Sequence, residues 1–346
     1  MTTLSLCMIV KNEAATLPRC LKSVASIVDE MIIVDTGSTD DTIAICESFG
    51  ARVISYQWDQ HFANARNFGL QEALGDWILW IDADEELDQQ AKTQIKEKIS
   101  IVSADMILLP LYHYYGKQVP VNTTEKFISH QNRLFRNHIG IQFFNRIHEQ
   151  AQHTDPNKTI AYERIDVPIH HYGYLQATTD DKQKGERNLQ LLEASSKEEP
   201  KNPWILYHLA SEYYRKKHYE RAFEFINLSI VYFLAQSSIP PSLAYRLKYA
   251  IMLESDNPGN ALSSIEKAID LYPDYVDLYY CKGCLHYEQK AYEQAIESFT
   301  KCLSLGEAHQ EYLIQNGVGS FRAQQMLEQC KANLYEAAAK KQAKNS

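Results

Sequence analysis

The sequence lacks a long apolar run, and this absence excludes an ordinary membrane-spanning helix. Stretches such as MIIV at 31–34 and WILWI at 77–81 are far shorter than the roughly 20 residues that cross a bilayer. The N-terminus also lacks the charged and apolar regions of a signal peptide. We therefore expect a cytoplasmic protein without a transmembrane segment.

Positive charge is scarce relative to negative charge. The 346 residues include 35 Lys and Arg against 44 Asp and Glu, which gives a formal net charge of −9. A general nucleic-acid binder owes its affinity to clustered Lys and Arg that neutralise phosphates. We expect no nucleic-acid partner, and an anionic ligand would have to be held by a metal ion or by a few placed cations.

The sequence also lacks a close pair of cysteines that looks like a metal clip. The chain has seven cysteines, and Cys281 and Cys284 are spaced as C-x-x-C inside a helical pattern, without a second such pair. A zinc clip usually needs two pairs. We expect ordinary buried thiols at these positions.

Within the first 85 residues, short apolar runs alternate with segments of helical periodicity. The runs are 4–10, 30–37, 51–58 and 76–84, and the helical segments are 17–28, 40–50 and 62–75. Strands buried on both faces have continuous apolar sequences, and strand–helix alternation is typical of a parallel sheet. This half is predicted to be a doubly wound, Rossmann-like α/β sheet, with ligands bound beyond the carboxyl ends of the strands.

Polar side chains end the predicted strands. Asn12 and Glu13 follow the first, Asp35 ends the second, and Asp82 and Asp84 end the fourth. We expect these side chains to converge on one crevice. The two carboxylates of the D-x-D motif are either solvated turn acids or ligands of a hard divalent cation that shares substrate phosphates.

The rest of the chain falls into two parts with different sequence patterns. Residues 104–115 and 167–174 are predicted strands, and residues 116–131 are predicted to form a flexible loop. After the polar joint SKEEPKNP the sequence becomes helical. We place the domains at 1–196, an α/β domain, and 197–346, an all-α domain.

The helical half repeats itself weakly. Ala222, Ala261 and Ala295 take equivalent places, 39 and then 34 residues apart, and Gly283 and Phe299 flank the third. The second spacing is that of tetratricopeptide repeats, although any helical bundle with alanine at close contacts is the alternative. Stacked helix pairs form a solenoid with a concave face, so this half is expected to hold a partner or a second copy of the protein.

Three segments of the first 90 residues are CMIVKNEAATLPRCLKSV, EMIIVDTGSTDDT and FANARNFGLQEALGDWILWIDADEEL. Together they resemble the inverting glycosyltransferases of family two, which have the GT-A fold. A weaker likeness continues through NRLFRN and NRIHEQ to HHYGY. The appended helices are similar to a branch of that family whose members act on peptides, among them the S-glycosyltransferases of glycosylated bacteriocins, or on cell-envelope glycans. The resemblance implies a hexosyltransferase with a nucleotide-sugar donor, most simply a UDP-sugar.

The resemblance also implies roles for the strand-end residues. Asp35, the backbone at Val10 and the side chain of Glu13 would line the pocket for the base or ribose. Asp82 would face the ribose and sugar. Asp84 would ligate Mn²⁺ or Mg²⁺, which bridges the diphosphate and neutralises charge on the leaving group.

Further residues are implied by the same resemblance. Arg66 would lie near the diphosphate, with a helix-surface salt bridge as the alternative, and Arg133 and Arg136 are weaker candidates for that work. His171 would complete the metal shell or contact a phosphate, and a core histidine is the alternative.

An inverting transfer usually needs a base for the proton of the attacking acceptor. The resemblance implies Glu149 for this role, and His148 is the runner-up. A structural acid paired with Arg146 or Arg133 is the alternative for Glu149. A cysteine acceptor would need less help from a base, because a thiol is already partly ionised near neutrality.

The acceptor itself stays open. A Cys, Ser or Thr side chain of a peptide could lie in the concave face of the repeats, or the acceptor could be a cell-envelope glycan while the repeats form a homodimer. We favour the peptide. A non-catalytic scaffold that only senses a nucleotide-sugar conflicts with the intact run of Asp35, Asp82 and Asp84, and an NAD-dependent dehydrogenase would need a G-x-G-x-x-G motif that does not follow the first strand.

Overall fold

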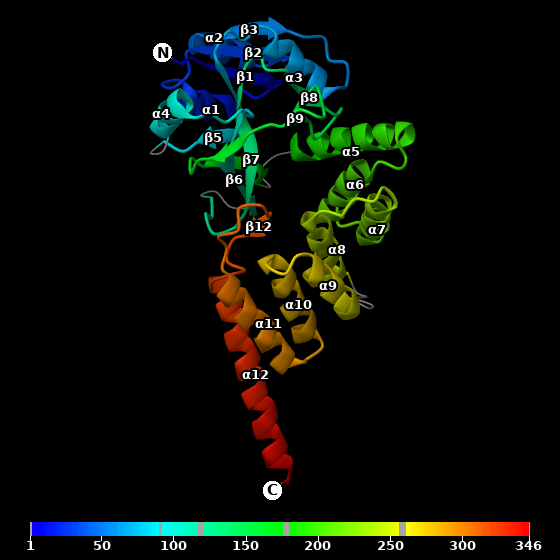
Figure 1. The fold of residues 1–346 in the computed structure, drawn as a ribbon. Coiled ribbons are helices and arrows are strands. Elements are labelled where there is room, and N and C mark those ends of the chain that lie inside the picture. Colours follow the sequence, from blue (N-terminus) through cyan, green and yellow to red (C-terminus); the bar gives the residue numbers. More distant parts are fainter. Residues whose placement is uncertain (1, 90–91, 117–120, 176–179, 256–260, 346) are drawn as a thin grey trace. The chain divides into compact units, whose positions relative to one another are not determined.

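The computed structural model describes residues 2–89, 92–116, 121–175, 180–255 and 261–345, and it divides into two compact units, Met1–Thr178 and Thr179–Ser346 (Figure 1). The first unit is an α/β unit and the second is helical. The division precedes helix α5 (Asp180–Glu198), whereas the sequence placed it at 196/197, inside that helix. Helix α5 packs against α6 (Pro203–Arg215), and Tyr213 Oη donates to Glu193 Oε1 at 3.0 Å, so α5 belongs with the helical unit.

The first unit begins as a strand–helix alternation and continues with strands. Its elements are β1 (Leu4–Val10), α1 (Leu17–Val24), β2 (Glu30–Asp35), α2 (Thr42–Ser48), β3 (Arg52–Ser55), α3 (Phe62–Leu70), β4 (Trp77–Trp80), β5 (Glu85–Leu87), α4 (Thr93–Ile101), β6 (Met106–Gly116), β7 (Lys126–Arg136), β8 (Ile141–Phe144), β9 (Gln150–His153), β10 (Tyr162–Arg164) and β11 (Ile169–Leu175). The predicted strands of the first 85 residues are all present. The apolar runs of β1, β2 and β4 are buried on both faces of the sheet, whereas β3 is only partly buried.

The main sheet has the order β3-β2-β1-β4-β7-β6-β11-β5, and β10 also pairs with β6. Strands β1 to β4 pair in parallel, as predicted, whereas β7 is antiparallel to both β4 and β6. Strand β6 therefore runs in the direction of β4, and β11 is parallel to β6. The carboxyl ends of β1, β2, β4, β6 and β11 thus lie along one edge of a mixed sheet.

The prediction of a flexible loop over residues 116–131 was wrong for its second half. Residues 126–131 begin strand β7, which pairs with β6 from Tyr114↔Lys126 to Met106↔Phe135. The polar side chains of KFISHQ hid the strand from a search for apolar runs, because these residues are only partly buried. Residues 117–120 lie outside the described part of the chain.

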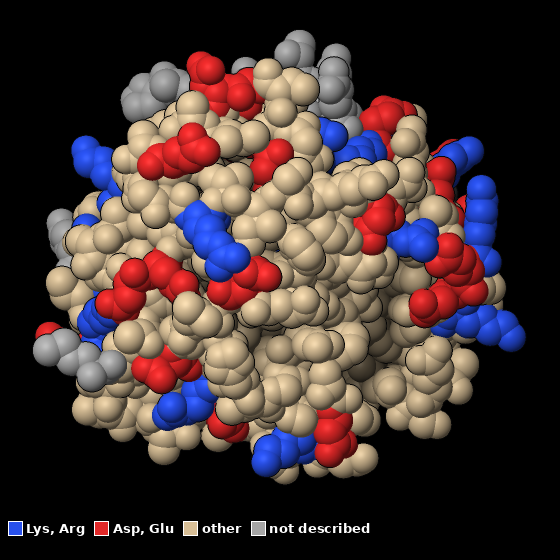
Figure 2. All heavy atoms as spheres, turned by 90° about the horizontal axis from the view of Figure 1, so that it is seen from above, with Lys and Arg blue, Asp and Glu red and all other residues tan. Residues whose placement is uncertain are grey.

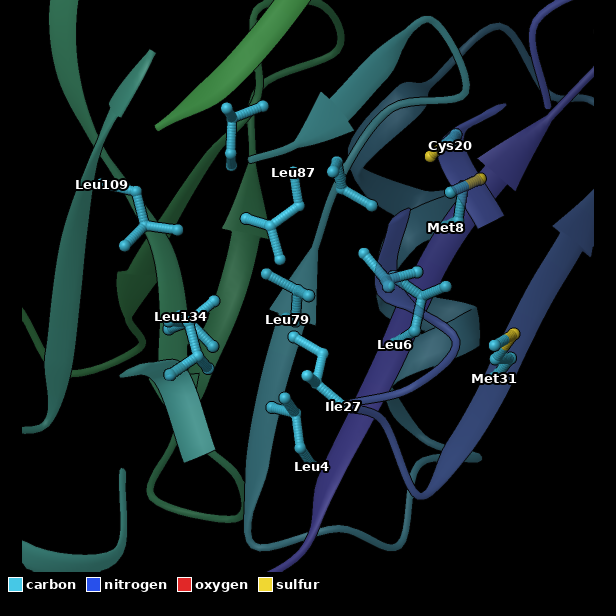
Figure 3. Packing of buried hydrophobic residues seen from close by; sticks show 14 of the residues in the cluster. Leu4, Leu6, Met8, Cys20, Ile27, Met31, Leu79, Leu87, Leu109 and Leu134 are labelled. Carbon is cyan, nitrogen blue, oxygen red and sulfur yellow. The ribbon is translucent and has the colours of Figure 1, made fainter. Parts of the chain in front are cut away.

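The core of the first unit lies on both faces of the sheet. On one face, Leu4, Leu6 and Met8 of β1 pack with Leu21 of α1 and with Ile95 of α4, and part of this cluster is drawn in Figure 3. On the other face, Cys7 and Ile32 pack with residues of α3 and of the β8–β9 hairpin. Alternate side chains of β1 thus serve opposite layers, which makes the strand ends rigid supports for the residues that follow them.

The second unit consists mainly of paired helices. After α5 and α6 its elements are α7 (Tyr219–Ala235), α8 (Ser242–Glu254), α9 (Ala261–Leu271), α10 (Val276–Glu288), α11 (Tyr292–Leu305), the short strand β12 (Ile314–Gln315) and α12 (Phe321–Asn345). The polar joint predicted at 196–203 separates α5 from α6, where Asn202 caps α6 by accepting from the amide of Trp204 at 3.0 Å.

The alanines that set the repeat phase are all buried at helix–helix contacts: Ala222 in α7, Ala261 in α9 and Ala295 in α11. Gly283 of α10 faces Phe299 of α11 so closely that a Cβ at position 283 would lie 2.6 Å from Phe299 Cε1. Glycine here allows a fully buried aromatic ring to fill the space between the two helices. The α10–α11 pair therefore has the small-residue contact that the repeat pattern predicted.

Candidate active site

The ends of β1 and β2 are joined side by side. Val10 pairs with Asp35 in register, and the amide and the hydroxyl of Thr36 both donate to the Val10 carbonyl at 3.0 Å. The Asp35 carboxylate is 3% exposed and accepts from the amides of Gly37 and Ser38, each at 3.0 Å. Val10 and Asp35 therefore lie side by side, and the Asp35 carboxylate stabilises the loop that follows β2 through these two hydrogen bonds.

Glu13 lies in the loop between β1 and α1, where its carbonyl accepts from the amides of Thr16 and Leu17. Its carboxylate accepts from the Thr16 hydroxyl at 2.9 Å, and its amide donates to the Thr42 hydroxyl at 2.8 Å. The neighbouring Asn12, with φ of 55°, accepts from the amide of Thr39 at 2.7 Å. These bonds tie the loop after β1 to the loop after β2, and Glu13 is half-buried between them.

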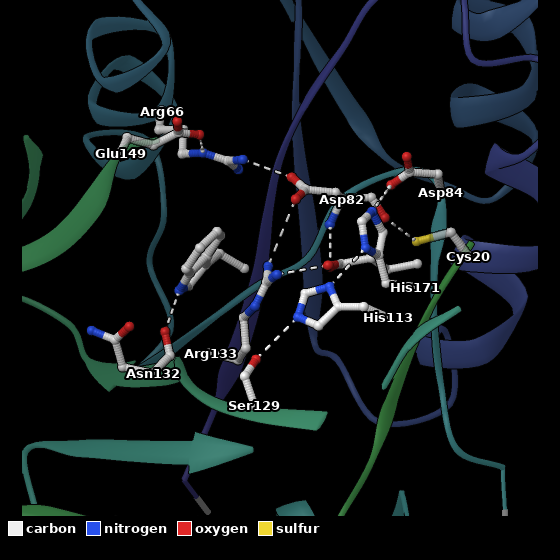
Figure 4. Close-up of polar contacts among 12 residues, drawn as sticks. Cys20, Arg66, Asp82, Asp84, His113, Ser129, Asn132, Arg133, Glu149 and His171 are labelled. Carbon is white, nitrogen blue, oxygen red and sulfur yellow. Dashed lines mark hydrogen bonds and ion pairs between the residues drawn. The ribbon is translucent and has the colours of Figure 1, made fainter. Parts of the chain in front are cut away.

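Asp82, after the end of β4, is the centre of an ion-pair network (Figure 4). Arg66 Nη2 donates to Asp82 Oδ1 at 2.6 Å, and Arg66 Nε donates to Glu149 Oε1 at 2.5 Å. Loss of solvent would raise the pKa of Asp82, but the positive charges of Arg66 and Arg133 outweigh it and lower the pKa to about 2. Asp82 is therefore a carboxylate at any physiological pH.

A second, more deeply buried ion pair adjoins this network. Arg133 Nη2 donates to Glu85 Oε1 at 2.6 Å, and these side chains are 3% and 1% exposed. Glu85 Oε2 accepts from the amide of Asp82 at 2.9 Å, and the Arg133 guanidinium lies 4.0 Å from the centre of the Trp80 ring. Burial raises the pKa of Glu85 to about 7, although Arg133 opposes the rise. Arg133 therefore supports the Asp82 turn from inside the core.

Asp84 and His171 form a separate pair at the same sheet edge. His171 Nε2 lies 3.7 Å from Asp84 Oδ1, and the side chains are 15% and 21% exposed. The Tyr172 amide donates to the Asp84 carbonyl at 3.2 Å, which fixes β11 against the D-x-D turn. Burial lowers the pKa of His171, but the hydrogen bond and the charge of Asp84 outweigh it, so the pKa is raised.

The space beside this pair depends on Gly173. A Cβ at position 173 would lie 2.5 Å from Asp84 Oδ2 and 2.6 Å from His171 Nε2. Glycine thus keeps open a cradle lined by one carboxylate oxygen and one imidazole nitrogen. In the described residues no group of three His, Cys, Asp or Glu is placed to hold a metal. The donor set therefore fits a divalent cation that takes its other ligands from substrate oxygens and water.

Two residues behind His171 were missed by the sequence search. His113 Nδ1 lies 3.1 Å from His171 Nδ1, and His113 Nε2 lies 3.0 Å from Ser129 Oγ. Burial and the nearby charges of His171 and Arg133 lower the pKa of His113 well below its usual value. The signal was absent from the sequence because it depends on the cross-strand pairing of β6 with β11.

Glu149 reaches the site through the β8–β9 hairpin. Asn67 of α3 exchanges two hydrogen bonds of 2.8 Å with the backbone of Phe143, and Arg66 next to it holds Glu149. The ion-pair partner is thus Arg66 and not Arg146 or Arg133, which the sequence offered as alternatives. His148, the runner-up, precedes Glu149 with φ of 54° and is half-buried.

Three further features concern the surface charge, the helices and the cysteines of the described residues. On the face shown in Figure 2, acidic and basic side chains are interspersed, and the described Lys and Arg residues do not gather there into one continuous basic patch. Among the described helices, none has the length and apolar content to span a bilayer. Cys281 is buried and Cys284 partly so, both as free thiols, and burial raises the pKa of each.

Comparison with known proteins agrees with this architecture. Residues 5–162 match the family model described as glycosyl transferase family 2, and residues 276–309 match the model of a tetratricopeptide repeat. A TPR repeat-containing protein of Synechococcus elongatus is 33% identical over 279 residues, which are 79% of this chain and 65% of the relative. The SPbeta prophage-derived glycosyltransferase SunS of Bacillus subtilis is 28% identical over 234 residues, 66% of this chain and 53% of the relative.

This chain therefore spans less than two thirds of the length of these two relatives. Among solved structures, S. aureus TarS 1–349 in complex with UDP-GlcNAc aligns with a TM-score of 0.40 and 16% identity, covering 83% of this chain and 92% of that chain. The tetratricopeptide match coincides with α10 and α11, where Gly283 and Phe299 make their contact. Residues 5–162, which contain most of the mixed α/β sheet, thus match glycosyl transferase family 2, and the helices that follow include a match to a tetratricopeptide repeat.

Proposed function

We propose that this chain is a metal-dependent, inverting glycosyltransferase that moves a hexosyl group from a UDP-sugar to a side chain of a peptide. The observation that carries the proposal is the pairing of Asp84 with His171 beside the gap left by Gly173. The name of the Bacillus subtilis relative, a glycosyltransferase, supports the same class of reaction.

The strand-end residues divide the donor between them. Val10 and Asp35 would bind the base and ribose, with Glu13 at the edge of the same pocket, and Asp82 would face the ribose and sugar. Asp84 and His171 would hold Mn²⁺ or Mg²⁺ against the diphosphate. When bound, such a cation neutralises charge on the departing nucleoside diphosphate. It would supply positive charge that a chain with a net charge of −9 has little of.

The proton of the acceptor would pass to Glu149. In the transfer, the bond between the anomeric carbon and the diphosphate oxygen breaks, and the acceptor atom bonds to the opposite face of the carbon. One carboxylate oxygen of Glu149 is bonded to Arg66, which fixes the orientation of the carboxylate while the proton is accepted. His148 is the second candidate for this step.

The helical unit supports a peptide as acceptor. Stacked helix pairs of the tetratricopeptide type present extended surfaces that bind peptide segments. If the helices instead form a homodimer, a cell-envelope glycan becomes the natural acceptor. The two cases differ in what the purified chain glycosylates and in its oligomeric state.

The test is donor turnover measured by mass spectrometry. The chain would be incubated with Mn²⁺ and a set of UDP-hexoses, first without acceptor, then with Cys-, Ser- and Thr-containing peptides, and then with envelope glycans. We expect slow donor hydrolysis alone and a hexose adduct on a peptide. An adduct confined to a glycan would replace the acceptor class, and no donor consumption in any mixture would leave only a nucleotide-sugar-binding scaffold.

A further inference from the structure

Three neighbouring strands place a chain of hydrogen-bonding groups behind His171. Ser129 lies on β7, His113 on β6 and His171 on β11, and the sheet order puts these strands side by side. His113 is directly opposite His171 in the β6–β11 register. Figure 4 shows the contacts running from Ser129 through His113 to His171, on the side away from Asp84.

We propose that His113 and Ser129 are positioning residues that fix the tautomer of His171, so that its Nε2 presents a lone pair to a divalent cation beside Asp84. The inference rests on the proposed function, because that function supplies the cation. It assigns a role to two residues that do not themselves touch donor, acceptor or metal. The geometry behind it consists of the contact between the two Nδ1 atoms and the contact between His113 Nε2 and Ser129 Oγ.

A histidine that binds a metal does so as the neutral imidazole. When His171 and His113 are both neutral, their Nδ1 atoms, 3.1 Å apart, must share a single proton between them. If His113 carries that proton, then His171 carries its own proton on Nε2, which points toward Asp84 Oδ1. If His171 carries it, then Nε2 of His171 is free of hydrogen, and His113 is protonated on Nε2. Only the second arrangement lets His171 act as a metal ligand.

Ser129 makes both arrangements available. A hydroxyl can accept from an imidazole N–H or donate to an imidazole lone pair. In the second arrangement His171 donates from Nδ1 to His113 Nδ1, and His113 donates from Nε2 to Ser129 Oγ. A cation beside Asp84 would favour this arrangement, because its charge disfavours a proton on His171 Nε2. That proton would leave to water, and a proton from water would be taken up at the Ser129 end of the relay. The two arrangements contain the same number of protons, and in each of them His171, His113 and Ser129 stay hydrogen-bonded to one another.

The sheet makes this relay rigid. The ring planes of His113 and His171 are nearly perpendicular, at 86°, with centroids 5.3 Å apart. The bond from the Tyr172 amide to the Asp84 carbonyl and the gap at Gly173 hold the opposite side of His171 in place. The orientation of His171 is therefore set from both sides before any ligand arrives, which is how outer residues raise the affinity of a metal site.

The experiment measures binding of Mn²⁺ to the full chain, with and without UDP, by the loss of the free-ion electron paramagnetic resonance signal. We expect His113→Leu to weaken binding about 10- to 100-fold, the usual effect of removing an outer hydrogen-bond partner of a metal ligand. His113→Asn keeps an acceptor near the position of Nδ1 and should stay within about threefold of the wild type. Ser129→Ala should fall between these two variants.

His130→Leu is the matched control. It makes the same substitution on β7 next to Ser129, and adjacent strand residues point to opposite faces of the sheet. We expect wild-type Mn²⁺ affinity for this variant. Equal affinity in the wild type and in His113→Leu would overturn the relay and leave the proposed function standing, whereas a wild type that binds no Mn²⁺ even with UDP would remove both.

A second measurement needs no variant. In a ¹⁵N-labelled wild-type chain loaded with Mg²⁺ and UDP, long-range ¹H–¹⁵N correlation spectra report which ring nitrogen of each histidine carries hydrogen. We expect His171 and His113 to carry it on Nδ1 and Nε2, respectively. A His171 protonated on Nε2 in the loaded protein would overturn the inference even if His113→Leu failed to fold.

Discussion

Arg66 Nε donates to Glu149 Oε1 at 2.5 Å, although the two residues are 83 positions apart in the chain. The same guanidinium binds Asp82 through Nη2, so it links the proposed base to the first acid of the D-x-D motif. The guanidinium also lies 4.8 Å from the centre of the Trp80 ring, in a buried setting. The Arg66 guanidinium thus orients both carboxylates, that of Asp82 and that of Glu149, the proposed base.

Replacing Glu149 with Gln should lower turnover and leave donor affinity almost unchanged. The amide retains a hydrogen-bond acceptor for Arg66 but cannot take a proton from the acceptor, so we expect kcat to fall about 10²- to 10⁴-fold. Steady-state kinetics and donor titration by calorimetry measure the two quantities. Turnover preserved together with weakened donor binding would show that Glu149 is a structural partner of Arg66, and His148→Gln would then be tested for the base.

Replacing Asp84 with Ala should abolish transfer and remove the metal-dependent part of UDP binding. The pair with His171 would be left with one donor atom, too few to hold a cation between protein and diphosphate. Calorimetric titration of UDP with Mn²⁺ and with a chelator gives the comparison. Asp270→Ala, an exposed acid on α9, is the control; Mn²⁺-dependent binding that survives in Asp84→Ala would contradict the assignment.

Replacing Gly173 with Ala should block the cation site. The new Cβ would lie 2.5 Å from Asp84 Oδ2 and 2.6 Å from His171 Nε2, so the side chains must move apart or the methyl group fills the cradle. We expect at least a tenfold loss of Mn²⁺ affinity, on the scale of changes to the groups around a metal ligand. Gly185→Ala in α5, where a Cβ meets nothing within 4 Å, should keep Mn²⁺ affinity and gain about 0.5–1 kcal/mol of stability. Equal Mn²⁺ binding by both variants would rule out this location for the cation.

Replacing Phe299 with Ala should destabilise the helical unit without changing donor binding. The ring is fully buried against Gly283, and removing it leaves a cavity between α10 and α11. We expect a loss of about 3–5 kcal/mol in the free energy of unfolding. Urea unfolding monitored by circular dichroism measures this loss. Loss of UDP binding at equal Mn²⁺ in the folded variant would mean that the two units do not act independently.

Local sequence patterns determined much of the first unit. Apolar runs as short as WILW identified strands, because a strand that is buried on both faces of the sheet has apolar residues at successive positions. The D-x-D motif and Asp35 stand where these strands end, so the edge that carries the site was also predictable. Strand β7 was not predictable, because its N-terminal half is only partly buried and contains no apolar run. Its position between β4 and β6 also depends on pairing between segments that are far apart in the sequence.

Tertiary structure alone decided how the charged residues are partnered. The alternatives for Glu149 named Arg146 and Arg133, yet α3 brings Arg66 to it because Asn67 anchors the β8–β9 hairpin. His113 has no feature in its own segment that marks it, and it gains a role only when β6 and β11 pair. The sequence by itself thus determined most element types and the edge that carries the candidate site, because burial and periodicity act over a few neighbouring residues. Which side chains meet there was decided by strand order, because that order joins segments far apart along the chain.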